Sequence, residues 1–145
     1  MILMDVNVLV YAHRSDCEQH AEYRGWLEGL MGGASNYGVS DIVLSSCVRI
    51  LTHPRIFDPP TPLAVAFDFV NQVRNSHNSI IISPGPRHWT IFVDLCRTAG
   101  ARGNLVPDAF LAALAIESDS EWITTDRDFA RFPDLRWRHP LRPDG

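Results

Sequence analysis

The first twelve residues of the chain constrain its fold more than any other stretch. Residues 1–4 are apolar, Asp5 follows at once, and an amphipathic run begins at Val6. This order predicts a buried strand that leads into a helix, with Asp5 at the junction. Open parallel α/β sheets place their ligands at the carboxyl ends of the strands. Asp5 is therefore expected where such a sheet carries its chemistry.

The composition excludes several classes of protein. A chain of 145 residues that is 46% hydrophobic and 21% charged is typical of one globular domain. All 13 basic residues are arginine, and the chain has no lysine. This excludes P-loop enzymes and Schiff-base enzymes, which need a lysine. It also excludes haloacid-dehalogenase-like phosphatases and response-regulator receivers, which use a lysine beside a strand-end aspartate. Because the net charge is -4, a nucleic-acid partner has to be held by a local arginine surface or through metal ions.

The sequence also bears on the compartment in which the protein works. No apolar run approaches the roughly 20 residues of a membrane helix, and the N-terminus does not resemble a signal peptide. The three cysteines lack the spacing of a metal site, which favours reduced thiols. We therefore expect a cytoplasmic protein without membrane contact.

Short strands and helices alternate along the chain. Beyond the first strand, we expect an interior strand at 79–83 and further strands at 37–39, 122–125 and 135–137. Helices are expected over residues 6–14, 20–31, 41–52, 62–77, 88–99 and 108–117. This pattern predicts an α/β fold with a short, mainly parallel sheet flanked by helices. It covers residues 1–138 as one domain and leaves 139–145 as a loose, proline-rich tail.

Three aspartates fall at equivalent structural positions. Asp5 and Asp126 each end an expected strand, and Asp108 begins an expected helix. The spacing between Asp108 and Asp126 fits one helix, one turn and one strand, which would return Asp126 near the start of that helix. Clusters of carboxylate oxygens are the ligands that Mg²⁺ and Mn²⁺ prefer.

Each acid also has a simpler explanation. Asp5 is suited to cap the helix that follows it. Asp108, after Pro107, is favoured in a first turn by the helix dipole, and Asp126 with Asp128 is consistent with a capped turn. The three acids together are less easily explained as caps. The residues alone predict a metal-carboxylate site and nothing more specific.

Four blocks of sequence carry a resemblance to a known family. In order along nearly the whole chain, they cover residues 1–12, 43–57, 107–115 and 124–129. They resemble PIN-domain proteins and, more narrowly, the VapC toxins of bacterial type II toxin–antitoxin systems. The resemblance implies a PIN-like three-layer fold and an endoribonuclease that depends on Mg²⁺ or Mn²⁺. It also implies a homodimer and inhibition by a VapB-like antitoxin.

The resemblance assigns the acids of the site. The catalytic, metal-binding aspartates fall on Asp5, Asp108 and Asp126, with Asp128 close behind. The family's usual second acid is a glutamate in the helix after the second strand, where this chain has Ser45-Ser46. Asp41, one turn earlier, is the nearest acid and is our assignment for that position. This departure bears on the charge of the site and on its affinity for metal.

Other polar residues are candidates for supporting roles. Asn7 is expected to brace Asp5, and Thr125 to hydrogen-bond a ligand or a phosphate. Arg49, Arg55 and Arg127 are candidate phosphate contacts, with solvated surface arginine as the alternative.

Two other functions fit the same sequence. A PIN-like module that has lost catalysis would still bind RNA or an antitoxin, and the missing glutamate motivates this reading. A PIN nuclease of RNA processing or DNA flap cleavage would share the site but would not be a toxin.

Overall fold

The computed structural model of the chain describes residues 1–142. Five short strands and six α-helices alternate, as the sequence predicts, and a 3₁₀ helix, η1, follows the fourth strand. The strands are β1 (Ile2–Met4), β2 (Tyr37–Val39), β3 (Ser79–Ile81), β4 (Glu121–Ile123) and β5 (Trp137–Arg138). The helices are α1 (Val6–His13), α2 (His20–Met31), α3 (Asp41–Leu51), α4 (Leu63–Arg74), α5 (His88–Ala99), α6 (Leu105–Glu117) and η1 (Arg127–Arg131).

The sheet is parallel throughout, with the strand order β3-β2-β1-β4-β5. The chain moves outward from β1 through β2 to β3 and then crosses over to β4 on the other side of β1. The order therefore reverses between β1 and β4, and ligands of open α/β sheets bind at the carboxyl ends of strands at this reversal. Asp5 follows β1 directly and lies at this point.

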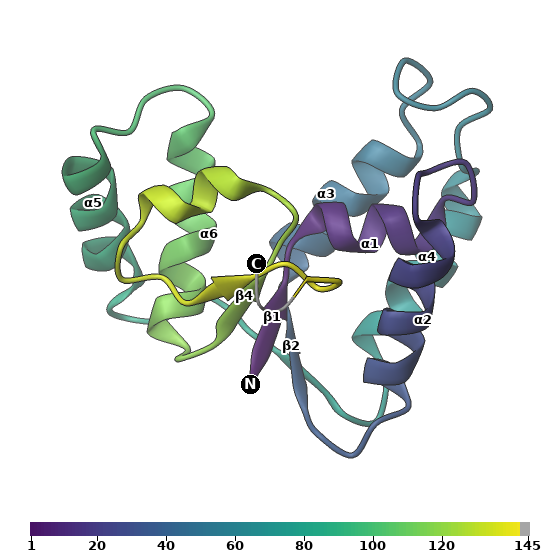
Figure 1. Ribbon diagram of the computed structural model, residues 1–145, viewed down its shortest axis with the longest axis horizontal. Helices are drawn as coiled ribbons and strands as arrows, with labels where there is room; N and C mark the ends of the chain where they lie inside the picture. Colours follow the sequence, from purple (N-terminus) through teal and green to yellow (C-terminus); the bar gives the residue numbers. More distant parts are fainter. Residues whose placement is uncertain (143–145) are drawn as a thin grey trace.

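Helices cover both sides of the sheet, as Figure 1 shows. Helices α1 to α4 lie on one side, and α5, α6 and η1 lie on the other. The core is formed by buried apolar side chains of the strands and of the helix faces that cover them. The expectation of a three-layer α/β fold is confirmed.

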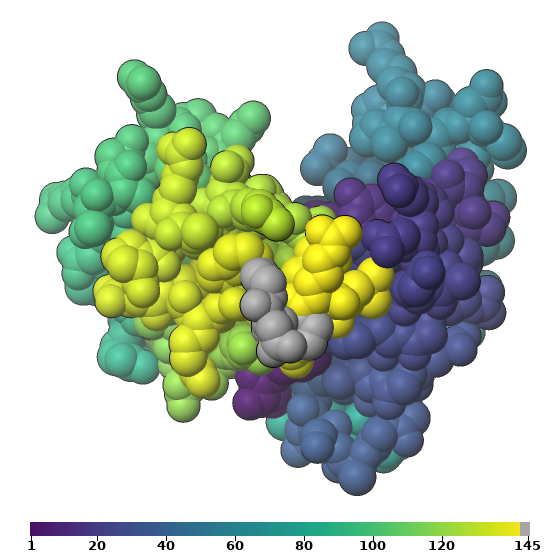
Figure 2. Space-filling model, in the orientation of Figure 1, coloured from purple at the N-terminus to yellow at the C-terminus, as the bar shows by residue number. Residues whose placement is uncertain are grey.

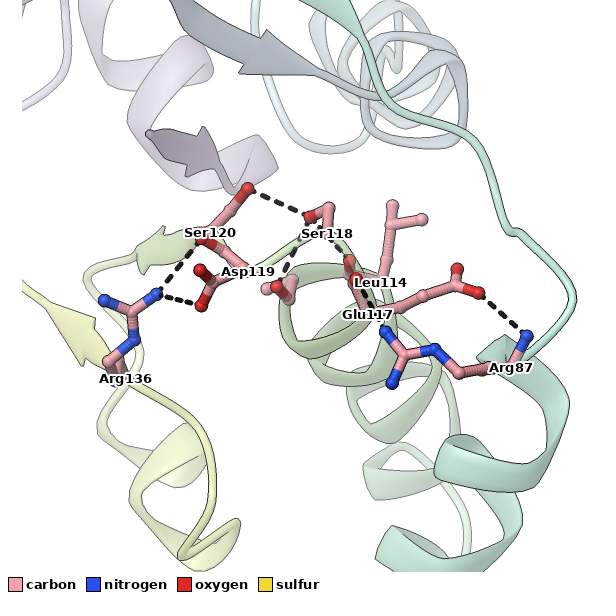
Figure 3. Close-up of polar contacts among 8 residues, drawn as sticks. Arg87, Leu114, Glu117, Ser118, Asp119, Ser120 and Arg136 are labelled. Carbon is pink, nitrogen blue, oxygen red and sulfur yellow. Dashed lines mark hydrogen bonds and ion pairs between the residues drawn. The ribbon is translucent and has the colours of Figure 1, made fainter.

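Hydrogen bonds hold the C-terminal end of α6 in place (Figure 3). The Glu117 carboxylate accepts from the backbone N–H of Gly85 at 2.7 Å and of Arg87 at 2.9 Å, which ties the end of α6 to the start of α5. Arg136 donates to the Asp119 carboxylate at 2.9 Å. Because α6 leads into the start of β4, which pairs in parallel with the central strand β1, the first turns of α6 with Asp108 lie toward the carboxyl edge of the sheet.

Several expected elements differ from the structure: α4 ends at Arg74 and not near 77, and β5 covers Trp137–Arg138 and not 135–137. The strand at 79–83 is not interior, since β3 lies at the edge of the sheet and Ile80 and Ile81 are each 39% exposed. Strand β4 ends at Ile123, and Thr124 turns to hydrogen-bond Asp5. Helix α6 begins at Leu105, which places Pro107 in the first turn, where no intrahelical N–H bond is lost.

Part of the C-terminal tail packs against the domain. His139 pairs with Arg142 in an isolated antiparallel bridge, Pro140 is buried, and Leu141 packs on the core. Residues 139–142 are thus ordered against the domain, and the rest of the predicted loose tail, 143–145, lies outside the described residues. Within residues 1–142, no helix is long and apolar enough to cross a membrane.

Candidate active site

The ends of β1 and β4 bring two stretches of chain together. The backbone N–H of Asp5 donates to the Ile123 carbonyl at 2.9 Å, so the pairing of the two strands extends one residue beyond β1. Thr124 is therefore placed beside Asp5, and its hydroxyl donates to Asp5 Oδ2 at 2.7 Å. Residues more than a hundred positions apart in sequence thus form one site.

Asp5 is both a helix cap and a member of the site. Its Oδ1 accepts from the Val6 N–H at 2.7 Å, which caps α1, while Oδ2 accepts from Thr124 and from Asn7 Nδ2, the latter at 3.2 Å. A carboxylate has about four acceptor positions, so these three bonds leave Oδ1 free to accept a further ligand. Burial raises the pKa of Asp5, and the nearby Asp126 adds to the rise.

Thr124 and Asn7 connect the two acidic strand ends. The fully buried Thr124 hydroxyl accepts from the Asp126 N–H at 3.1 Å and lies 3.3 Å from Asn7 Nδ2. Asn7 Oδ1 accepts from the Thr125 N–H at 3.2 Å. The structure thus contains the expected contact between Asn7 and Asp5, and the hydroxyl that bonds Asp5 belongs to Thr124, whereas Thr125 takes part through its backbone.

Asp108 faces the same site from α6. Partial burial raises its pKa to about 6, and the carboxylates of Asp126, Asp5 and Asp128 contribute in that order. These four acids therefore lie within electrostatic range of one another. Asp126 also caps η1, because its Oδ1 accepts from the Asp128 N–H at 2.9 Å. We call Asp5, Asp108 and Asp126 the acidic centre.

Asp41 is not joined to the acidic centre. It is the first residue of α3, which Ser40 caps, and its two carboxylate oxygens accept from Arg74 at 2.8 and 3.2 Å. The Arg74 guanidinium lowers the pKa of Asp41. Asp41 is not among the acids that raise the pKa of Asp5 or Asp108, so its role as the second acid stays a prediction.

The expected phosphate contacts lie on different elements. Arg49 is exposed in the last turn of α3, Arg55 is exposed in the loop that follows, and Arg127 is exposed at the start of η1, next to Asp126. Within residues 1–142, none of these three arginines is in an ion pair.

The chemistry of the acidic centre fits a hard divalent cation. The carboxylate of Asp126 raises the pKa of Asp5, and both raise the pKa of Asp108; a cation would relieve that repulsion. Within residues 1–142, no three Asp, Glu, His or Cys side chains are already arranged around one metal position. Mg²⁺ does not require such a cage, because it commonly keeps several waters and takes only one or two carboxylates from the protein.

Fold and site together define an α/β domain with an acidic centre of the kind that metal-dependent nucleases use. The family model described as "PIN domain" matches residues 2–135. Ribonuclease VapC43 of Mycobacterium tuberculosis is 45% identical over 141 residues, covering 97% of this chain and 96% of that protein. Ribonuclease VapC25 of the same organism is 42% identical over 140 residues, covering 97% and 99%. The chain therefore belongs to the PIN-domain family and, within it, to the VapC ribonucleases.

Solved structures agree on the fold. The structure of VapBC2 from Rickettsia felis bound to a promoter DNA fragment matches with a TM-score of 0.67 and 21% identity, covering 96% of this chain and 98% of that one. VapBC-1 from nontypeable Haemophilus influenzae matches with a TM-score of 0.65 and 17% identity, covering 97% and 98%. At such low identity, these likenesses establish the shared architecture alone.

Proposed function

We propose that this protein is a metal-dependent endoribonuclease that hydrolyses RNA phosphodiester bonds and acts as the toxin of a toxin–antitoxin pair. The observation that carries the proposal is the convergence of Asp5, Asp108 and Asp126 at the strand-order reversal. Two relatives with more than 40% identity over nearly the whole chain are named VapC ribonucleases, which supports the same activity.

We assign Mg²⁺ or Mn²⁺ to the acidic centre, with Asp5, Asp108 and Asp126 binding it directly or through its bound waters. When bound, such an ion polarises a phosphodiester and makes water a better nucleophile. Thr124 and Asn7 hold the Asp5 carboxylate in one orientation through the contacts at 2.7 and 3.2 Å. This fixed geometry limits the reorganisation that the site needs when substrate arrives.

We retain Asp41 as the fourth acid of the proposed site. For this role it has to leave Arg74, and the pair is open to solvent, with side-chain exposures of 60% for Asp41 and 39% for Arg74. Exposed ion pairs of this kind are weak, so a cation would compete with Arg74 at little cost. Arg49 and Arg127 are proposed to contact RNA phosphates, and Asp128 to support Asp126 through the cap of η1.

Cleavage of single-stranded RNA by the purified protein tests this function. Asp5→Ala and Asp108→Ala are each expected to abolish cleavage in Mg²⁺ or Mn²⁺, with a folded protein shown by a cooperative thermal transition. Asp94→Ala is a matched control, because Asp94 is an exposed acid on α5 outside the acidic centre. Unchanged cleavage by both site variants, or equal loss in the control, would contradict the assignment.

We propose a small VapB-like antitoxin as the protein partner. A hollow of about 360 Å³ between α1, α2 and α4 supports this, because it combines apolar side chains such as Leu27 and Phe69 with charged ones such as Arg24 and Asp68. Co-expression with the product of a short reading frame just upstream of the gene is expected to relieve growth arrest. Continued arrest with a well-expressed upstream product would contradict the pairing.

We also propose a homodimer of this chain. The edge strand β3 leaves Ile80 and Ile81 exposed, and Phe67 on α4 is exposed as well. Light scattering of the purified protein is expected to give twice the mass of the chain, and a monomer mass at working concentration would contradict this.

An inert PIN-like module is the second candidate. The chain has Ser45-Ser46 where the family has glutamate, and Asp41 is held by Arg74. An inert module would bind RNA or the antitoxin but would neither bind Mn²⁺ nor cleave RNA. Calorimetric titration with Mn²⁺ and a cleavage assay on the same preparation separate the two functions.

A further inference from the structure

The arginines of the protein divide into those with an acidic partner and those without. Five form ion pairs with a nearby carboxylate, namely Arg14, Arg24, Arg74, Arg136 and Arg138. Each of these guanidinium groups already donates to a carboxylate, which leaves fewer of its N–H groups free for a ligand. The arginines outside these pairs are therefore the candidates for binding an anion.

Two such arginines are close in sequence, where α5 leads through a short loop into α6. Arg97 is in the last turn of α5, and Arg102 is in the loop that joins the two helices. Both are exposed, and neither is in an ion pair with any residue of the range 1–142. No local sequence pattern marks either residue, because only the fold shows which end of the sheet they occupy.

The loop that carries Arg102 has a defined shape. Gly100 and Gly103 flank it with φ values of 59° and 58°, a backbone conformation that favours glycine. The Ala101 N–H donates to the Cys96 carbonyl at 2.8 Å, and the Val106 N–H donates to the Gly103 carbonyl at 3.1 Å. The backbone on both sides of Arg102 is thus held by hydrogen bonds.

This loop lies at the carboxyl edge of the sheet, where the parallel strands end and where the acidic centre lies. Helix α6 runs from the loop, past Asp108 in its first turns, to the start of β4 at the opposite edge. In Figure 1 the α5–α6 loop and the loop after α3 stand on opposite sides of the junction between β1 and α1. Figure 2 shows the surface hollowed between these two parts of the molecule, coloured green and teal.

We propose that Arg97 and Arg102 hold backbone phosphates of the RNA strand on the α6 side of the acidic centre. The inference rests on the proposed ribonuclease function and adds positioning residues to it. An acidic centre in a protein of net charge -4 repels a polyanion, so affinity for RNA requires local cations beside it. Arginine suits this role because its guanidinium binds phosphate in a bidentate fashion.

The salt dependence of RNA binding tests the proposal. Fluorescence anisotropy of a labelled single-stranded RNA, measured in EDTA to prevent turnover, gives the slope of log affinity against log salt. For single strands each lost phosphate contact lowers this slope by about 0.7. Arg97→Gln and Arg102→Gln are each expected to lower it by that amount, and Arg102→Lys is expected to retain most of it because the charge remains.

Arg136→Gln is the matched control, because Arg136 is paired with Asp119 near the opposite end of α6 (Figure 3). Its slope is expected to equal that of the wild type. In cleavage assays with Mg²⁺, the two test variants are expected to raise KM several-fold with little change in kcat, since they position substrate without touching the reacting atoms.

The outcomes separate this inference from the proposed function. A wild type that cleaves RNA, together with variants whose salt slope and KM are unchanged, would overturn the inference and leave the ribonuclease standing. Unchanged RNA binding with weakened antitoxin binding would assign the loop to the protein partner and also overturn it. A wild type that neither binds nor cleaves RNA would remove the ribonuclease function and the inference with it.

Discussion

Replacing Thr124 with valine tests the link between the two strand ends. Valine keeps the shape of threonine but removes the hydroxyl that donates to Asp5 at 2.7 Å and accepts from the Asp126 N–H at 3.1 Å. Thr124 is fully buried, so water cannot replace these bonds. A hydrogen bond to a charged group contributes about 1.5–3 kcal/mol to stability, and we take about 2 kcal/mol as the cost.

Thermal unfolding measures that cost. For a chain near 150 residues, 1 kcal/mol shifts Tm by about 2–4 °C, so Thr124→Val is expected to lower Tm by about 4–8 °C at pH 7.5. Thr125→Val is the control, because the structure describes no hydrogen bond of the Thr125 side chain. It is expected to change Tm by no more than about 1–2 °C.

The pH dependence of the Tm difference between the wild type and Thr124→Val identifies the hydrogen bond to Asp5 as the source of that difference. The Thr124 hydroxyl lowers the pKa of Asp5, against the rise that burial causes. Its loss raises that pKa further, so the folded variant loses more stability than the wild type as pH rises through the pKa of Asp5. The Tm difference should shrink toward pH 4, where the carboxyl is protonated. Equal Tm values at pH 7.5, or a difference that does not change with pH, would refute the reasoning.

Three further predictions concern the other acids and the sheet. Because the pKa of Asp108 is raised to about 6, its ionisation destabilises the metal-free fold as pH rises through that value. In EDTA, Asp108→Asn should therefore have a higher Tm than the wild type at pH 7.5 and lose this advantage near pH 4. An equal or lower Tm at pH 7.5 would contradict the repulsion. Arg74→Gln should raise the affinity for Mn²⁺ in calorimetry by releasing Asp41, and an unchanged affinity would argue against Asp41 as a ligand. Gly38→Ala should cost about 1–3 kcal/mol in denaturant unfolding, because a Cβ would lie 3.0 Å from Ile82 Cγ1 and 3.1 Å from the Ile2 carbonyl oxygen; wild-type stability would show that β2 can shift to accommodate it.

The sequence predicts much of the fold because its local signals agree with the tertiary structure. The apolar run before Asp5, the serine cap before Asp41 and the glycines after α2 each mark a boundary that the structure contains. The place of β3 is not predictable in this way. A run of isoleucines looks alike at the edge and in the middle of a sheet, and only the order of the strands decides which it is.

The site is predictable from sequence in its acids but not in its contacts. Asp5, Asp108 and Asp126 stand out because each follows or begins an element at the same edge of a parallel sheet. Thr124 does not stand out from Thr125, because a shift of one residue at the end of β4 decides which hydroxyl faces Asp5. The pairing of Asp41 with Arg74 joins two helices, α3 and α4, and no local pattern indicates it.

Calorimetric titration of the purified protein with Mn²⁺ at pH 7.5 tests the acidic centre most directly. We predict saturable binding by the wild type and by Asp94→Asn, and a loss of at least tenfold in affinity for both Asp5→Asn and Asp108→Asn. Equal affinity in the wild type and in these two variants would contradict the claim that the carboxylates at the ends of β1 and α6 form one metal centre.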